Sequence, residues 1–256
     1  MRFDVISLFP ELFAPFFISG VTRRAYESGL VEVKLWNPRD FAEGNYKRVD
    51  DRPFGGGPGM VMLAEPLALC LAAIRAERAS NADPVVLFAP VGEVLNHAAV
   101  ELWSSSHGAI LICGRYEGID QRFIDTYVTH QISLGDFVLS GGEIAAMALL
   151  DAVARLQPGV LNDAGSHQLD SFNPALDGLL DCPHYTRPVD WQGQTVPTVL
   201  MSGNHAHVER WRRDQRLNLT QRRRPELVEK ARMAGQLTAK DEACLMTVAE
   251  SRGQKR

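Results

Sequence analysis

The first 160 residues alternate short apolar runs with longer segments of helical periodicity. Apolar runs of strand length occupy residues 3–9, 31–36, 85–89, 109–114 and 130–133. Amphipathic or apolar segments of helical length lie between and after them, at residues 11–28, 65–79, 96–104, 121–126 and 143–156. This alternation predicts an α/β fold in which a mostly parallel sheet carries helices on both faces.

The pattern changes after the last of these helices, which is expected to end at Gln157-Pro158-Gly159. Residues 162–173 are polar and weakly patterned, and we interpret them as a linker. Helical patterns at 208–217, 225–234 and 239–250 then predict a smaller, mainly helical domain. The expected organisation is a sheet domain at 1–161, the linker at 162–173 and the helical domain at 174–256.

Composition narrows the class of protein. No apolar run reaches the length of a membrane span, and Asp4, Pro10 and Glu11 interrupt the apolar N-terminus in a way that argues against a signal peptide. The four cysteines form no C-x-x-C pair, and no His or Cys spacing matches a common zinc template, so we predict no metal-ligand cluster. Scattered single thiols favour a reducing, cytoplasmic location.

Basic residues are concentrated near the C-terminus, although the net charge is −4. Residues 205–232 contain nine basic and four acidic side chains, and Trp211 lies among the arginines. Arginines interleaved with an aromatic residue are typical of a surface that binds nucleic-acid phosphates. A solvated helix face explains the same composition equally well.

Glycines follow two of the predicted strands, in Gly114-Arg115-Tyr116-Glu117-Gly118 and in residues 134–142, and Pro90 follows a third. Ligands of parallel α/β sheets bind outside the carboxyl ends of the strands, so we expect these segments to meet in one crevice. Tight turns that pack a strand against a helix are the simpler alternative.

Other candidate residues have ordinary explanations beside the functional ones. Arg155 is expected in the last turn of its helix, where the dipole favours any cation, and Asp170 could be a turn residue. Glu117 could be a first-turn acid of the next helix. The glycine-rich segment 50–60 lacks the signatures of a P-loop and of a dinucleotide-binding turn. It is either a loop that closes over a substrate or a plain cluster of turns.

Several motifs together resemble one enzyme family. Residues 115–120 and 134–143, with 53–60, Asp170-Ser171-Phe172, 178–188 and 200–205, are similar to the TrmD family of bacterial tRNA (guanine-N1)-methyltransferases, which belongs to the knotted SPOUT class. The resemblance runs from residue 3 to about residue 227. It implies a deep trefoil knot at the C-terminal edge of the sheet domain, built by residues 89–92, 113–118 and 133–143. It also implies an obligate homodimer whose active sites combine both subunits.

The resemblance further implies the cofactor, the substrate and the site. The methyl donor would be S-adenosyl-L-methionine and the substrate the tRNA anticodon stem-loop, methylated at N1 of the guanine immediately 3′ of the anticodon. Asp170 would be the general base, Arg155 would stabilise negative charge on the purine, and Glu117 would lie in the active site. The implied cofactor-binding residues are Gly114, Leu134, Gly135, Asp136, Phe137, Val138 and Leu139, with Tyr116, Pro90 and Gly141 as further candidates. The family's activity is associated with Mg²⁺, for which the sequence has no diagnostic site.

Three alternatives remain open from the sequence. Another knotted methyltransferase, acting on ribose 2′-OH or on ribosomal RNA, would not need Asp170 as a base for a ring nitrogen. An RNA-binding protein without catalysis is disfavoured by the intact glycines and by Asp170 and Arg155. A nicotinamide oxidoreductase is disfavoured because no strand is followed by G-x-G-x-x-G.

Overall fold

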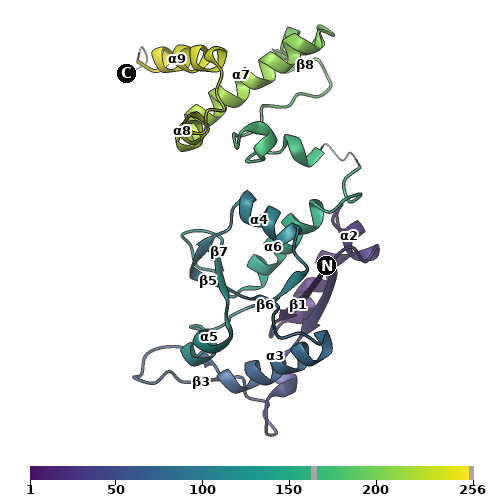
Figure 1. The fold of residues 1–256 in the computed structure, drawn as a ribbon, viewed down its shortest axis with the longest axis vertical. Coiled ribbons are helices and arrows are strands. Elements are labelled where there is room, and N and C mark those ends of the chain that lie inside the picture. Colours follow the sequence, from purple (N-terminus) through teal and green to yellow (C-terminus); the bar gives the residue numbers. More distant parts are fainter. Residues whose placement is uncertain (163–165, 254–256) are drawn as a thin grey trace. The chain divides into compact units, whose positions relative to one another are not determined.

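The protein, described by a computed structural model over residues 1–162 and 166–253, divides into two compact units, 1–162 and 163–256. The first unit is built on one five-stranded sheet with strand order β2-β1-β6-β5-β7, and every neighbouring pair in it is parallel (Figure 1). The strands are β1 (Arg2–Ile6), β2 (Glu32–Trp36), β5 (Val85–Val94), β6 (Gly108–Ile112) and β7 (His130–Ser133). The α/β prediction with a parallel sheet is confirmed.

Helices cover both faces of this sheet, as predicted. Along β6, Ile110 and Ile112 belong to the core on the side of α3 and α5, whereas Ala109 and Leu111 belong to the core on the side of α4 and α6 (Figure 1). This alternation follows from the two-residue period of a strand, and both faces are apolar because both are covered. The helices are α3 (Ala64–Arg78), α4 (His97–Ser104), α5 (Gln121–Tyr127) and α6 (Glu143–Arg155).

The continuous helix expected at residues 11–28 is wrong. The chain instead forms short pieces, because Pro10 and Pro15 restrict the start and Gly20 has a φ of 72° that an α-helix does not allow. The apolar periodicity is nevertheless used, since Phe17 packs edge-on against Tyr26. The short elements of this unit are η1 (Pro10–Phe13), α1 (Ala14–Phe17), α2 (Arg23–Glu27), η2 (Pro38–Phe41), β3 (Asp50–Asp51) and β4 (Val61–Met62).

Strand β5 is longer than predicted, because it continues past residue 89 to Val94. Its pairing with β7 shifts register between Phe88 and Glu93, so Ile132 pairs with both. At Gly92 a side chain is impossible, since a Cβ there would lie 2.4 Å from the backbone nitrogen of Ile132. Residues 89–92, one of the three segments expected to build a trefoil knot, thus approach the backbone of β7 closely, and the knot itself stays a prediction.

The second unit is mainly helical and has a small core of Leu179, Leu217, Val228, Ala231 and Leu245. Its long helix α7 starts at Asn204, whose side chain accepts a hydrogen bond from the His207 N–H, and Pro225 starts the next helix. Its elements are η3 (Ser166–Leu169), η4 (Pro174–Leu176), β8 (Asp190–Trp191), β9 (Gln194–Thr195), η5 (Thr198–Met201), α7 (His205–Arg223), α8 (Pro225–Met233) and α9 (Ala239–Gly253).

Helix α7 is longer at both ends than the predicted 208–217. The extra turns are polar, so hydrophobic periodicity could not have revealed them. Within residues 1–162 and 166–253, no helix is both long enough and apolar enough to cross a membrane.

Candidate functional site

A cavity of about 530 Å³ opens at the carboxyl edge of the sheet in the first unit. Three segments form most of its lining: the middle of β5 at residues 87–91, the loop after β6 at 114–119, and the end of β7 with the following loop at 131–134 and 137–142. These are the segments that the strand-end rule placed together, so the predicted crevice is confirmed.

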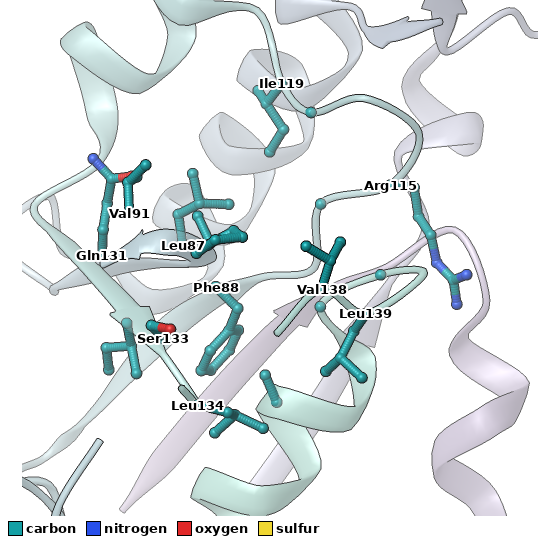
Figure 2. A pocket seen from close by; sticks show the side chains of 18 of the residues that line it. Leu87, Phe88, Val91, Arg115, Ile119, Gln131, Ser133, Leu134, Val138 and Leu139 are labelled. Carbon is teal, nitrogen blue, oxygen red and sulfur yellow. The ribbon is translucent and has the colours of Figure 1, made fainter. Parts of the chain in front are cut away.

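One wall of the cavity is apolar. Phe88 from β5 and Leu134, Val138 and Leu139 from the loop after β7 gather on one side of it, as Figure 2 shows. Val138 is 83% exposed, so this wall offers apolar surface that a flat ring could cover. Such a wall suits a ligand with an aromatic base.

The loop after β7 takes its shape from Ser133 and Gly135. The buried Ser133 hydroxyl accepts a hydrogen bond from the Gly135 N–H at 3.1 Å, and Gly135 has a φ of 144° that other residues rarely adopt. The Phe137 N–H then donates to the Gly135 carbonyl oxygen at 2.9 Å. The loop is thus a defined turn, with Phe137 and Val138 displayed at its tip.

The loop after β6 is held open on the opposite side by the glycine-rich segment. The Glu117 N–H donates to the Met60 carbonyl oxygen at 2.9 Å, and a Cβ at Gly59 would lie 2.4 Å from the Glu117 side chain. Tyr116, beside them, has a left-handed φ of 60°, a strained conformation that often marks functional sites. The glycine-rich segment therefore supports the cavity wall; whether it also moves over a substrate stays a prediction.

A buried ion pair lies behind the cavity. Glu143, the first residue of α6, is 1% exposed and lies 3.0 Å from the Arg115 Nε. The Ser7 hydroxyl, beyond the end of β1, donates a hydrogen bond to Glu143 Oε1 at 2.8 Å. Burial raises the pKa of the neighbouring Cys113 thiol well above its usual range, so this thiol remains protonated and is a poor nucleophile.

Most of the residues predicted to bind a cofactor line this cavity. Gly135 and Asp136 belong to the same loop but not to the lining. The predicted cofactor-binding residues found in the lining are Pro90, Gly114, Tyr116, Leu134, Phe137, Val138, Leu139 and Gly141, and Glu117, predicted as a catalytic residue, lies there too. Their placement brings them together, and their individual roles stay predictions.

Comparison with known proteins identifies the family. Residues 1–230 match the family model described as tRNA (Guanine-1)-methyltransferase TrmD. The chain belongs to this family. It is 78% identical over 254 residues to a tRNA (guanine-N(1)-)-methyltransferase from Polaromonas sp., with 98% of each chain covered. A protein of the same name from Bordetella pertussis is 55% identical over 255 residues, covering 98% of this chain and 99% of that one.

Two residues with expected catalytic roles lie outside the cavity lining, namely Arg155 and Asp170. Arg155 is half-buried in the last turn of α6, as predicted, and belongs to the first unit. Asp170 belongs to the second unit, between the 3-10 helices η3 and η4, where its N–H donates to the His167 carbonyl oxygen at 3.3 Å. The next residue, Ser171, accepts a hydrogen bond from the Asp181 N–H at 2.9 Å.

The arginine-rich part of this TrmD-family chain is less available to a nucleic acid than its composition indicates. Arg210 and Arg213 pair with the buried Asp241, and Arg216 is itself buried and pairs with Asp181. Ion pairing to carboxylates of the same unit thus accounts for much of the cluster, an arrangement that neither interpretation of the sequence predicted. Exposed basic residues such as Arg222 and Arg223 remain on the surface at the end of α7.

Sequence reasoning missed part of the cavity. Leu87 and Phe88 precede Pro90 in a predicted strand, so their position near a carboxyl end was a usable signal. Ile119 and Arg115 lie in the motif that carried the family resemblance, but nothing local marked them as wall residues. Asp120, in contrast, caps α5 by accepting a hydrogen bond from the Arg122 N–H, which is the ordinary role of an N-cap aspartate.

Proposed function

We propose that this protein is an S-adenosylmethionine-dependent tRNA (guanine-N1)-methyltransferase that modifies the guanine immediately 3′ of the anticodon. The observation that carries the proposal is the carboxyl-edge cavity of a TrmD-family chain, walled by the loop after β7 and by Gly114. Its volume of about 530 Å³ lies within the roughly 300–1,000 Å³ of small-molecule sites.

The residues of the cavity fit S-adenosylmethionine. Leu134, Val138 and Leu139 would cover the faces of the adenine, and the peptide groups of their loop would bond its edge. A Cβ on Gly114 would meet only Ile119 and Leu87, at 3.8 Å, so the absence of a side chain there leaves room on the cavity side. When bound, the cofactor supplies a methyl group on a sulfonium, and a correctly positioned acceptor can attack it in line.

The acceptor must lose a proton during transfer, because N1 of guanine is protonated at neutral pH. We assign Asp170 as the base that takes this proton while the N1–methyl bond forms. Arg155 would stabilise the negative charge that develops on the purine O6. Glu117 would contact the guanine from the cavity wall. Arg155 belongs to the unit 1–162 and Asp170 to the unit 163–256.

We further infer that the protein acts as a homodimer in which the cavity of one subunit works with Asp170 of the other. A mixing experiment tests this: Asp170→Asn and Gly114→Val should each be inactive alone, and co-refolded mixtures should recover about a quarter of wild-type activity, as expected for random pairing of two-fold dimers. Sedimentation checks that both variants associate. No recovery in associated mixtures would contradict a shared site.

The substrate assignment rests on chemistry as well as on family. An anticodon loop is single-stranded RNA, in which a base can be turned outward to expose N1. Exposed arginines of the second unit would contact phosphates and add affinity without base specificity, so binding should weaken steeply with salt. Action on tRNA would place the protein in the cytoplasm.

One experiment tests the proposed function directly. The protein is incubated with labelled S-adenosylmethionine and an unmodified tRNA transcript, and the methylated nucleoside is identified and mapped. The matched control transcript carries adenine in place of the guanine 3′ of the anticodon and should take up no label. Label on a ribose, or none in tRNA, would overturn the proposal.

A magnesium requirement is a separate proposal, supported only by the family's association with the ion. Among residues 1–162 and 166–253, no group of three or more His, Cys, Asp and Glu side chains is arranged to hold a metal. We therefore derive no step through the ion. Chelation by EDTA should lower turnover, and restoration by added Mg²⁺ checks that the loss is specific.

A further inference from the structure

The buried pair of Arg115 and Glu143 is placed where it can control the cofactor loop, residues 134–142. Glu143 begins α6, directly after this loop, and accepts a hydrogen bond from Ser7 as well as the ion pair from Arg115. An acid in the first turn of a helix is favoured by the dipole without any partner and usually stays in water. Burial at 1% exposure between two partners indicates a further role.

Arg115 contacts the end of the cofactor loop directly. Its Nη1 donates to the Ser140 carbonyl oxygen at 3.2 Å, and its backbone forms a β-bridge with Gly141. A Cβ at Gly141 would lie 2.2 Å from the Arg115 Nε, so the glycine is what lets the guanidinium lie against the loop backbone. On its other side, the guanidinium covers the ring of Phe9, and the Arg115 Cζ lies 4.5 Å from the ring centroid.

The side chain of Arg115 takes no part in the apolar wall of the cavity. Figure 2 shows it directed away from Phe88, Leu134 and Val138, although its own loop lines the cavity. Its contacts therefore join the loop after β6, the cofactor loop and the segment after β1 from behind. Three strand ends, far apart in sequence, are tied together at one point.

We infer that Arg115 and Glu143 are positioning residues that hold the cofactor loop in its binding conformation before S-adenosylmethionine arrives. The inference rests on the proposed cofactor site. Breaking one partner of a buried pair leaves the other uncompensated, so the loop end would move to re-solvate it. The apparent dissociation constant then rises in inverse proportion to the fraction of molecules whose loop keeps the binding conformation. Saturating cofactor restores the loop, so kcat should change little.

The test compares Glu143→Gln and Arg115→Lys with the wild-type protein. Calorimetry measures binding of S-adenosylmethionine without tRNA, and steady-state assays with saturating tRNA separate KM for the cofactor from kcat. We expect Glu143→Gln to raise the dissociation constant and KM about 10- to 100-fold, with kcat within about threefold. Arg115→Lys keeps the charge but loses the Nη1 hydrogen bond to the Ser140 carbonyl oxygen, so its effect should be smaller.

A matched control separates positioning from general loss of stability. Asp4 is also a fully buried carboxylate of this sheet; it pairs with Arg2 and Arg78, and none of these residues lines the cavity. Asp4→Asn should lower the melting temperature and leave cofactor binding unchanged. Wild-type affinity in Glu143→Gln, or equal weakening in Asp4→Asn, would overturn the inference. If the wild-type protein itself binds no S-adenosylmethionine, the proposed function fails instead.

Discussion

The two units of this chain are stabilised in different ways. In the first, two clusters of buried apolar residues sandwich the sheet, and its chief buried ion pairs lie at Asp4 and Glu143. The second has five buried apolar residues in its core and adds the buried polar groups Arg216, Thr220 and Asp241. Buried apolar side chains thus make up most of the core of the first unit, whereas buried charged and polar groups are a larger share of the second.

This difference changes how the arginines should be interpreted. Composition alone leaves a nucleic-acid surface and a solvated helix face equally open for the arginines of α7, but Arg210, Arg213 and Arg216 pair with carboxylates of their own unit. In the first unit, the ion pair of Arg115 and Glu143 behind the cavity likewise has a local role, because it positions the cofactor loop. Both units therefore hold ion pairs within the fold, and in the first unit one such pair also lies behind the cavity; four predictions test the comparison of the two units.

The largest effect is expected from Asp170→Asn, because it removes the proposed base and nothing from the cavity. Turnover should fall by about 10²–10⁴-fold, the range of general-base catalysis, while cofactor affinity measured by calorimetry stays near the wild-type value. Single-turnover assays locate the loss in the chemical step. Full turnover in this variant would remove Asp170 from the mechanism.

The next effect is on the stability of the second unit. Burial alone would raise the pKa of Asp241, but hydrogen bonds from Thr238 and pairing with Arg213 outweigh it and lower the pKa to about 2. Because the folded-state pKa lies below the ordinary 3.8, this stabilisation is complete above about pH 4 and is lost as the pH falls toward 2. It amounts to about 2 kcal/mol.

Asp241→Asn should therefore reduce the free energy of unfolding by about 2 kcal/mol at pH 7 and by much less near pH 2. Chemical denaturation at both pH values measures the difference, and hydrogen exchange locates it in α7 and α9. The control Glu226→Gln removes an exposed carboxylate paired with Arg224 and should change stability little. Equal destabilisation at both pH values would exclude charge pairing as the cause.

A smaller effect is expected from adding one methyl group to the first unit. A Cβ at Gly142 would lie 2.8 Å from the Cα of Cys113, so Gly142→Ala must push the cofactor loop away from β6. Overpacking of this kind costs about 1–3 kcal/mol, and thermal denaturation without ligand should show it. Gly114→Ala meets only ordinary contacts at 3.8 Å, so its melting temperature should stay unchanged. A larger loss of stability in Gly114→Ala than in Gly142→Ala would contradict this packing of Gly142 against Cys113.

The smallest effect should come from Arg223→Gln. Arg223 is exposed and enters none of the ion pairs found among residues 1–162 and 166–253. Its loss should weaken tRNA binding a few-fold and reduce the slope of log K against log salt by about one, without altering stability. Arg213→Gln, in contrast, should destabilise the protein. Filter binding across a salt series, with thermal melts, distinguishes the two arginines.

Local patterns predicted much of the first unit. The bounds of β7 match the apolar run at residues 130–133, and the rule that ligands bind at strand carboxyl ends placed Pro90, Gly114 and Leu134 in one cavity. These predictions succeeded because burial imposes a period on the sequence and parallel strands share one edge. The arginine surface and the helix at 11–28 were predicted less well, because ion-pair partners and glycine-broken turns leave no such period.

The amino-acid sequence by itself determined the class of fold, the edge of the sheet that carries the cavity and, through its motifs, the family. Only the tertiary structure decided that Ser7, Arg115 and Glu143 meet behind the cofactor loop and that Arg213 is committed to Asp241. The physical reason is that hydrophobic periodicity can be detected within a short stretch of sequence, whereas the partner of a buried charge can lie at any distance along the chain. Between Ser7 and Glu143 that separation is 136 residues.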